Sequence, residues 1–400
     1  MSVQSTPSAN RIHIGFFGRR NAGKSSTLNA VTGQAMAVVS AHKGTTTDPV
    51  LKAMELLPLG PVMVIDTPGF DDAGSLGELR VQKTLQILRK TDIAVLVADA
   101  TEGLGACEQE LLSLFEQRDI PYLIAYNKCD VCTEREPLAD NALYISAKTG
   151  EGIEALKERV AALRTEQEEK PIAGDLLAAG DTVLLVVPID TAAPKGRLIL
   201  PQVQTIRDIL DAGARALVVK ENEVEGALQN CKQPPRLVIT DSQVFAAVSK
   251  AVPRSIPLTS FSILMARYKG YLATAVRGVK ALNTLKEGDR VLIAEGCTHH
   301  RRCEDIGTVK IPRWLKQATG CRLEIETCSG TAFPEDLSPY KLIIHCGGCM
   351  LNEREVKYRM KAAEQQGVPF TNYGIFIAAV TGILERSVEM LDIDDKSTTD

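Results

Sequence analysis

The sequence has no hydrophobic run long enough to cross a bilayer and no excess of positive charge. A membrane-spanning helix needs about 20 consecutive apolar residues, and no such run occurs among the 400 residues. Residues 1–10 are rich in Ser and Thr and lack the apolar core of a signal peptide. Lys and Arg total 46 against 50 Asp and Glu, a balance that gives no general affinity for nucleic acid or anionic membranes. We therefore expect a cytoplasmic protein with no membrane and no nucleic acid among its partners.

The sequence also gives no sign of a disulfide framework. Cytosolic proteins keep their thiols reduced, so clustered cysteines there indicate metal or redox chemistry. Six of the ten cysteines fall between residues 297 and 349, whereas the other four are spread over the first 231 residues. The last third of the chain is therefore chemically different from the rest.

Apolar segments that alternate with helical segments predict an α/β protein of several domains. The first series has predicted strands at 12–17, 62–65, 93–98 and 122–126, with helices at 24–31, 79–89, 108–117 and 153–169. A smaller second series has strands at 182–187, 216–219 and 237–240 and helices at 206–212 and 242–250. A third has strands at 290–294, 323–326, 341–344 and 369–372 and ends in a helix over 375–391. We expect a flexible N-terminus over 1–10, then α/β domains over 11–172, 173–265 and 266–400.

The turn after the first predicted strand has the sequence of a phosphate-binding loop. Residues 18–25 read G-R-R-N-A-G-K-S and fit the pattern G-x-x-x-x-G-K-[ST] between a strand and a helix. The glycines let backbone N–H groups surround phosphate, while Lys24 and Ser25 meet the β/γ-phosphates and Mg²⁺. This context makes a chance glycine-rich turn a poor explanation.

Four further motifs follow in a fixed order. They are Thr45-Thr46-Thr47, Asp66-Thr67-Pro68-Gly69, Asn127-Lys128-Cys129-Asp130 and Ser146-Ala147-Lys148. This order resembles the motifs of GTPases, which implies that Asp130 accepts from guanine, that Asn127 and Lys128 support the base loop, and that GTP is favoured over ATP. The nucleotide-binding set is Gly18, Asn21, Ala22, Gly23, Lys24, Ser25, Ser26, Asp66, Gly69, Asn127, Lys128, Asp130, Ser146, Ala147 and Lys148.

The same motifs suggest how GTP would be hydrolysed to GDP. Asp66 is the expected carboxylate of the Mg²⁺ shell, with Ser25 and a switch threonine, Thr46, as further ligands. Phe70 stands where Ras-like GTPases carry a water-positioning glutamine, so unaided hydrolysis should be slow. The phosphate loop resembles that of the TrmE/Era branch, which implies that Asn21 helps to bind a stimulating K⁺. We take Lys24, Asn21, Thr46 and Asp66 as the catalytic set.

Two features near these motifs have competing interpretations. Glu78 falls where TrmE-type enzymes hold a catalytic glutamate, but the surrounding residues match poorly, so a solvated carboxylate explains it equally well. Cys129 and Cys132 form C-x-x-C, which is found in redox and metal sites. Because Cys129 fills the variable position of the guanine motif and no second Cys/His pair is near, we favour no metal or redox role there.

A second constellation lies near the end of the chain. Cys297-Thr298-His299 and His345-Cys346-Gly347-Gly348-Cys349 each follow a predicted strand. Residues after neighbouring parallel strands converge on one crevice, which would bring three thiolates together. Three cysteines and a histidine suit an iron-sulfur cluster or a zinc site, and spacing does not choose between them. A structural role at a strand end remains the alternative for each histidine.

The motif C-x-H followed at long range by H-C-x-x-C, downstream of a phosphate loop, resembles the HydF family of FeFe-hydrogenase maturation GTPases. The resemblance covers the whole chain and implies a GTPase domain, a dimerisation domain and a cluster domain in a homodimer. It implies a 4Fe-4S cluster on Cys297, Cys346 and Cys349, with a fourth position that is exchangeable or held by His345 or His299. It also implies that a transient diiron subcluster made with the radical-SAM maturases HydE and HydG is delivered to apo FeFe-hydrogenase.

Two other functions use the same motifs. A TrmE/Era-like RNA-modification or ribosome-associated GTPase with a structural zinc domain would have a similar phosphate loop, but it should carry a basic RNA surface. A redox enzyme would need a substrate pocket, which the sequence does not reveal. The segment 182–261 contains no recognisable chemical motif and is expected to be architectural.

Overall fold

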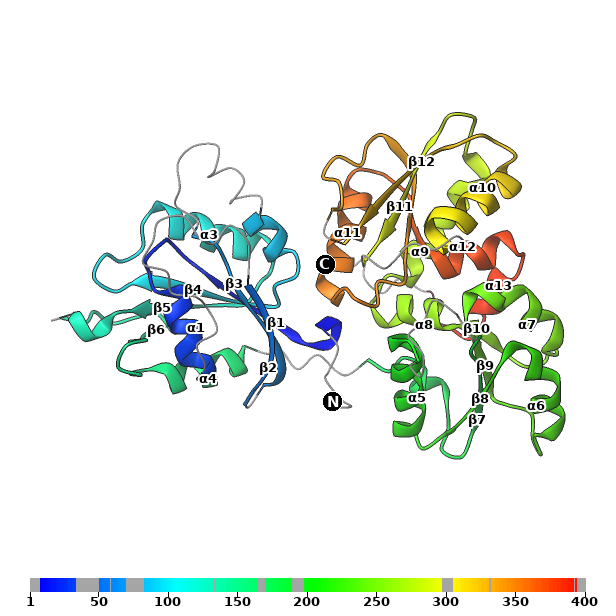
Figure 1. Cartoon of the computed structure of the whole chain (residues 1–400), viewed down its shortest axis with the longest axis horizontal. Coiled ribbons are helices and arrows are strands. Elements are labelled where there is room, and N and C mark those ends of the chain that lie inside the picture. Colours follow the sequence, from blue (N-terminus) through cyan, green and yellow to red (C-terminus); the bar gives the residue numbers. More distant parts are fainter. Residues whose placement is uncertain are drawn as a thin grey trace. The chain divides into compact units, whose positions relative to one another are not determined.

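The computed structural model describes residues 8–33, 50–57, 59–69, 83–132, 134–163, 170–188, 198–296, 305–330, 332–391 and 393. The chain divides into two compact units, Met1–Glu168 and Glu169–Asp400. Figure 1 shows the elements of both units, coloured along the sequence.

The first unit is built on a mostly parallel sheet whose described strands follow the order β2-β3-β1-β4-β5-β6. These strands are β1 Ile12–Phe17, β2 Val50–Leu56, β3 Gly60–Asp66, β4 Ile93–Asp99, β5 Tyr122–Asn127 and β6 Ala142–Tyr144. Only β2 pairs antiparallel, at the edge against β3. Strand β4 is buried along its whole length, as expected for a strand covered on both faces.

Helices cover both faces of this sheet (Figure 1). Helices α1 (Lys24–Thr32) and α4 (Ile153–Ala162) pack on one face. Helix α3 (Ala106–Gln117) and the helical residues 83–88 pack on the other. Short 3-10 turns occupy Ser8–Asn10 and Cys129–Val131. The loops at the carboxyl ends of the strands are where an open α/β sheet binds its ligands.

The second unit begins with a parallel sheet in the order β10-β9-β7-β8. Its strands are β7 Thr182–Val186, β8 Arg215–Val219, β9 Leu237–Thr240 and β10 Leu258–Ser260. Its helices are α5 Leu200–Asp211, α6 Val224–Asn230, α7 Phe245–Ala251 and α8 Phe261–Tyr268, with 3-10 turns at Gly174–Leu176, Glu221–Glu223 and Ser242–Val244. Among the described strands, β8 lies at one edge of this sheet.

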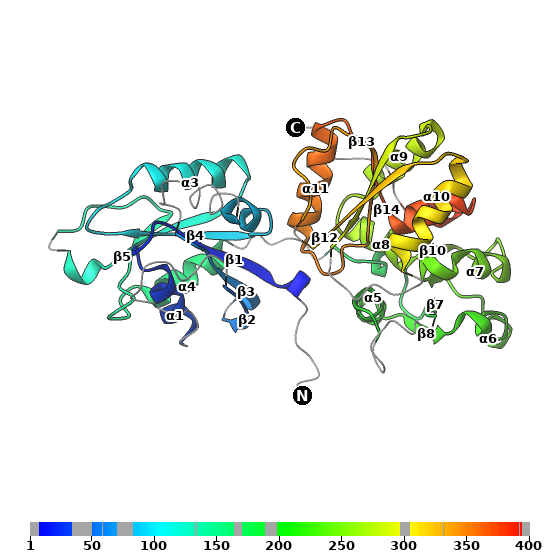
Figure 2. The same ribbon diagram turned by 45° about the horizontal axis from the view of Figure 1, so that its top comes forward.

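A second parallel sheet follows in the order β12-β11-β13-β14. Its strands are β11 Arg290–Glu295, β12 Glu324–Ser329, β13 Tyr340–His345 and β14 Phe370–Asn372. The helices are α9 Leu272–Val279, α10 Ile311–Thr319, α11 Glu353–Gln365, α12 Tyr373–Val380 and α13 Leu384–Val388, with a 3-10 turn at Lys280–Thr284 and a π-helical turn at Ile306–Lys310. Figure 2 shows α11 and α10 on opposite sides of this sheet.

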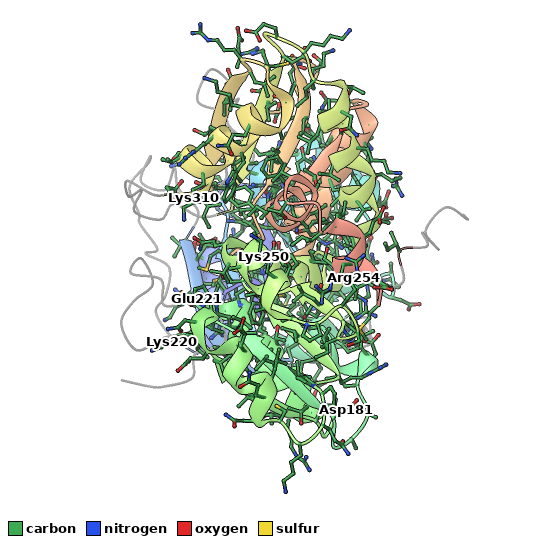
Figure 3. All side chains as sticks on the ribbon, turned by 90° about the vertical axis from the view of Figure 1, so that its right-hand side faces the viewer. Asp181, Lys220, Glu221, Lys250, Arg254 and Lys310 are labelled. Atoms are coloured by element: carbon green, nitrogen blue, oxygen red, sulfur yellow. The ribbon has the colours of Figure 1, made fainter. Side chains whose placement is uncertain are left out.

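The two sheets of the second unit share one hydrophobic core that runs from Ile172 to Leu391. Arg386 of α13 strengthens the connection by donating hydrogen bonds to the carbonyls of Ser249, Val252, Pro253 and Ile256 at 2.7–3.1 Å. Lys310 donates to Gln243 at 3.1 Å across the same junction; Figure 3 labels this lysine. The second unit is therefore held together by apolar packing and by polar contacts between its parts.

The α/β class expected from the sequence is confirmed, but one predicted element is wrong. The helix predicted over 375–391 is two helices, because α12 ends at Val380 and α13 begins at Leu384. Gly382 between them has φ of +73°, a left-handed conformation that glycine adopts without the Cβ penalty and that ends helices. The N-terminal part of the helix predicted over 79–89 lies outside the described residues.

Candidate functional site

The phosphate loop joins β1 to α1 with the backbone that its glycines permit. Gly18 has φ of +140° and Gly23 has φ of +92°, so both occupy conformations that other residues rarely adopt. A Cβ on Gly18 would lie 2.2 Å from the carbonyl oxygen of Val97, and one on Gly23 would lie 2.2 Å from Asn127 Nδ2. Asn21, with φ of +63°, is exposed at the tip. The loop thus packs closely against β4 and the end of β5.

Lys24, Ser25 and Asp66 gather at the mouth of this loop. Lys24 Nζ donates to the carbonyl oxygens of Gly18 and Arg19 at 3.0 and 2.7 Å, and Ser25 Oγ donates to Asp66 Oδ2 at 2.6 Å. Burial raises the pKa of Asp66, while the hydrogen bond from Ser25 and the charge of Lys24 lower it in part. Asp66 Oδ1 is buried and has no hydrogen-bond partner among the described residues. That unsatisfied oxygen suits a Mg²⁺ shell.

The expected base loop forms at the carboxyl end of β5. Asn127 Nδ2 donates to the carbonyl of Ala22 at 2.9 Å, and Asn127 Oδ1 accepts from the Ala147 N–H at 3.0 Å. Ser146 Oγ donates to Asp130 Oδ1 at 2.7 Å, and the Asp130 side chain is exposed. Asn127 therefore joins the phosphate loop to the segment 146–148 and leaves Asp130 facing outward.

The remaining predicted nucleotide residues lie around these two loops. Ser26 is half-buried in α1, and Lys148 is exposed beside Ala147. A Cβ on Gly69 would lie 3.0 Å from the Arg20 backbone nitrogen, so this glycine allows the chain after β3 to approach the phosphate loop. Three predicted features lie outside the described residues: Thr45–Thr47, which includes the switch residue Thr46, Phe70 and Glu78.

Sequence reasoning missed two acidic residues that support the nucleotide loops. Glu108 is fully buried and accepts from Arg19 Nε at 2.5 Å and from the Gly105 N–H at 3.0 Å, which ties the phosphate loop to the start of α3. Asp99 accepts from Lys128 Nζ at 2.5 Å. Burial acts to raise the pKa of Asp99, but hydrogen bonds from Lys128 and Thr101 outweigh it and hold the pKa low. Glu108 is the third residue of α3, where a glutamate is typical of a capping box, but the helix predicted from the sequence began at Glu108 and so hid this signal.

The second candidate site lies where β11 and β13 end side by side. Ala294 pairs with His345 across the two parallel strands. The N–H of Gly296 donates to Cys346 Sγ at 3.0 Å, and the N–H of Gly348 donates to the same sulfur at 3.3 Å. Burial raises the pKa of the Cys346 thiol, and these two N–H groups act against it. The chain immediately before Cys297 is therefore in contact with Cys346.

The C-x-x-C loop after β13 needs glycine at one of its two central positions. Gly348 has φ of +61°, and a Cβ there would lie 3.1 Å from Val356 Cγ2. A Cβ on Gly347 would lie 3.8 Å from Ser262 Oγ, an ordinary contact. Cys349 is half-buried at the end of the loop. The loop thus turns tightly against the start of α11.

His345 is fully buried, with both ring nitrogens in contact with protein groups. Nδ1 lies 2.6 Å from the carbonyl oxygen of Cys346 and must donate to it, which leaves Nε2 to accept from Arg359 Nη1 at 3.3 Å. Arg359 is also fully buried and donates to Glu355 Oε1 at 2.9 Å and to the Gly330 carbonyl at 2.5 Å. Burial lowers the pKa of His345 to about 3, and the charge of Arg359 adds to this effect. To bind iron through Nε2, His345 would have to give up its contact with Arg359.

A buried lysine lies beneath the C-x-x-C loop. Lys269, which follows α8, is 5% exposed and donates through Nζ to the carbonyls of Gly348 and Leu351, the latter at 2.9 Å. Burial lowers the pKa of Lys269 to about 8, while the thiolates of Cys349 and Cys346 act to raise it. Nothing in the sequence distinguishes this lysine from a surface residue.

Two residues before Lys269, the end of α8 also holds the first residues of the second unit. Arg267 forms an ion pair with Asp175, with 2.9 Å between Nη1 and Oδ1, and donates to the Ile172 carbonyl at 3.3 Å. The hydrogen bond from Arg267 lowers the pKa of Asp175. The segment that follows the first unit is therefore fixed to the same helix end as the C-x-x-C loop.

No group of three or more His, Cys, Asp or Glu side chains within the described residues is arranged to hold a metal ion. Two of the predicted ligands, Cys297 and His299, lie outside those residues. Cys346 and Cys349 do fit an iron-sulfur group, because the two residues flank a tight glycine turn and the Cys346 sulfur accepts from the N–H groups of Gly348 in that turn and of Gly296 after β11.

Comparisons with protein families define the class of each part. Residues 13–128 match a family of GTPases described as 50S ribosome-binding GTPase, in agreement with the phosphate and base loops of the first unit. This unit is a GTPase domain. Residues 172–270 match the hydrogen maturase F dimerization domain, and residues 273–390 match the hydrogen maturase F tetramerization domain. The chain belongs to the hydrogen maturase F (HydF) family.

Curated relatives include tRNA modification GTPases named MnmE. That of Thiobacillus denitrificans is 34% identical over 144 residues, which cover 36% of this chain and 32% of the relative. That of Dichelobacter nodosus is 33% identical over 165 residues, which cover 40% of this chain and 36% of the relative. The chain thus spans about a third of the length of the curated relatives it matches.

Among solved structures, Aquifex aeolicus Era bound to GDP.AlF4- is 20% identical and covers 52% of this chain and 93% of its own, with a TM-score of 0.36. A TM-score this low supports no structural argument. Within the described part of the chain, every helix is too short or too polar to cross a bilayer.

Proposed function

We propose that the protein is a GTP-binding and GTP-hydrolysing scaffold that carries a 4Fe-4S cluster and assembles and delivers a diiron subcluster to apo FeFe-hydrogenase. The observation that carries the proposal is the contact between the Gly296 N–H and Cys346 Sγ. It brings the residue before Cys297 to the C-x-x-C loop, as a shared three-cysteine site requires. Membership of the HydF family supports the same function.

In the GTPase domain, the proposed roles follow from the positions of the side chains. Lys24 is within reach of phosphates bound in the loop, and Ser25 and Asp66 supply adjacent oxygens for Mg²⁺. Bound Mg²⁺ would neutralise charge on the β- and γ-phosphates. Asp130 faces outward to accept from guanine. Asn21, at the loop tip, is the proposed K⁺ contact, with Thr46 as the switch residue.

In the cluster domain, Cys297, Cys346 and Cys349 are the proposed iron ligands, with His345 or His299 close by. A bound cluster with one exchangeable position would offer an iron to which an incoming precursor can attach. The protein's own contribution is to donate the N–H groups of Gly296 and Gly348 to the Cys346 sulfur. The radical-SAM maturases HydE and HydG are the proposed suppliers of the diiron cargo.

Self-association is proposed to use the exposed edge of the first sheet in the second unit. Leu217 and Val218 on β8 and Val203 and Leu210 on α5 are 37–56% exposed, and an unpaired strand edge can pair with a second copy. They lie in the segment that matches a dimerization domain. Val218→Lys should lower the mass measured by light scattering to that of one chain. An unchanged mass would show that the interface lies elsewhere in the chain.

The first test is metal and sulfide analysis of anaerobically purified protein, with EPR after dithionite reduction. About four irons and four sulfides per chain, with a reduced-cluster signal that Cys297→Ser removes, would support the scaffold function. Stoichiometric zinc without sulfide, persisting after iron reconstitution, would contradict it. That result would instead leave a GTPase with a structural zinc domain and direct the search towards RNA.

Potassium dependence is a separate test of the GTPase half. GTP hydrolysis should be faster in K⁺ than in Na⁺ at equal ionic strength, and Asn21→Ala should remove the difference. Equal rates in the two salts would refute the role proposed for Asn21 while leaving the GTPase assignment intact.

A further inference from the structure

Lys269 is a buried cation without a carboxylate partner among the described residues. Its ammonium group contacts two backbone carbonyls, Gly348 and Leu351, which stand on either side of Cys349 in the chain. The nearby Glu353 carboxylate is already paired with Lys357 at 2.5 Å. Removing an ammonium group from water costs several kcal/mol unless hydrogen bonds and opposite charge compensate. Two neutral carbonyls satisfy its hydrogen bonds but supply no negative charge.

The position of this ammonium group is fixed by the end of α8. The Lys269 N–H donates to the Met265 carbonyl at 3.0 Å, and the Tyr271 N–H donates to the Ala266 carbonyl at 3.0 Å. Gly270 between them has φ of +74°, so the chain turns sharply after the helix. The lysine therefore extends from a rigid base into the C-x-x-C loop, which itself has no regular secondary structure.

We propose that Lys269 is the positioning residue of the C-x-x-C loop and the counter-charge of its thiolates. By donating to the carbonyls of Gly348 and Leu351, it fixes the loop in the turn that holds Cys346 and Cys349 near each other. Its positive charge offsets the negative charge of those sulfurs and of whatever they bind. The counter-charge role rests on the proposed cluster function, whereas the loop-anchoring role does not.

Two variants separate the two roles. Lys269→Met keeps most of the side-chain length and removes both the charge and the hydrogen bonds. Lys269→Arg keeps the charge but does not place a single nitrogen on both carbonyls. Lys250→Met, at an exposed lysine on α7 labelled in Figure 3, is the matched control. Fluorescence of Trp314, the single tryptophan, which packs on the core beside the second sheet of the second unit, checks that this unit is folded in each variant.

The loop-anchoring role is measured on protein without any metal. Hydrogen exchange of the amides of residues 346–351 should be about tenfold faster in Lys269→Met than in the wild type, since two hydrogen bonds that hold the loop are lost. Lys250→Met should exchange like the wild type. Wild-type exchange in Lys269→Met would overturn the anchoring role. If that variant does not fold, Lys269→Arg decides: faster loop exchange supports the role, and unchanged exchange overturns it.

The counter-charge role is measured on reconstituted protein. Removing a positive charge beside a cluster disfavours its reduction, so the midpoint potential of Lys269→Met should shift to more negative values. The potential of Lys269→Arg should stay close to that of the wild type. A potential unchanged in Lys269→Met would overturn this role. If wild-type protein takes up no cluster at all, the proposed function fails, and the exchange data still decide whether Lys269 anchors the loop.

Discussion

The two central glycines of the C-x-x-C loop should respond differently to the same substitution. Two effects should lower the stability of Gly348→Ala. The alanine must adopt left-handed backbone at φ of +61°, and its Cβ lies 3.1 Å from Val356, whose side chain is fully buried. The left-handed conformation alone costs an alanine about 1–2 kcal/mol, and crowding in a packed core adds up to about 1 kcal/mol more. Gly347→Ala meets only an ordinary 3.8 Å contact, so we expect it to be within about 0.5 kcal/mol of wild type.

The single tryptophan makes this comparison specific to the second unit. Trp314 is the only tryptophan in the chain and packs on the core between α10 and the second sheet. Urea unfolding followed by its fluorescence therefore reports on the unit that holds the loop. With a slope of about 2 kcal/mol per M, a loss of about 2 kcal/mol lowers the midpoint by about 1 M. Equal midpoints for the two alanine variants would refute the reasoning from backbone conformation.

Other predictions address the separate sites. Lys24→Ala should abolish GTP hydrolysis and leave the iron content unchanged, and Cys346→Ser should do the reverse; loss of both properties in either variant would show that the sites depend on each other. In the full chain without metal, the second unit should lose stability as the pH falls below about 6.5, which Trp314 fluorescence measures. Folded His345 has a pKa of about 3, whereas unfolded histidine takes up a proton near 6.5. His345→Gln should flatten that pH dependence, and an equally steep slope in the variant would exclude His345 as its source.

The parts predicted from the sequence were those that depend on local pattern. The strand, loop and helix around Lys24 follow from glycine placement and apolar runs. That the ends of β11 and β13 lie at the same edge of the sheet follows from the rule that parallel strands bring their carboxyl ends together, but their direct pairing does not. The guanine-loop contacts of Asn127 likewise follow from a motif whose geometry is the same wherever it occurs.

The parts that could not be predicted are buried polar contacts between residues far apart in the chain. Glu108 binds Arg19 across 89 positions, and Lys269 binds the Gly348 carbonyl across 79. Charged residues are mostly exposed, so an isolated Lys or Glu in a sequence is assigned to the surface unless the fold brings a partner to it. The contact of His345 could not be predicted for the same reason, because its buried partner Arg359 lies in the next helix, α11.

The end of α8 ties together two parts of the second unit that the sequence keeps far apart. Arg267 holds Ile172 and Asp175, just after the chain leaves the GTPase domain, and Lys269 holds the C-x-x-C loop. The segment that leaves the GTPase domain and the C-x-x-C loop therefore share one anchor, the end of α8. A substitution that weakened the Arg267 ion pair would release that segment and leave the contacts between Lys269 and the loop in place.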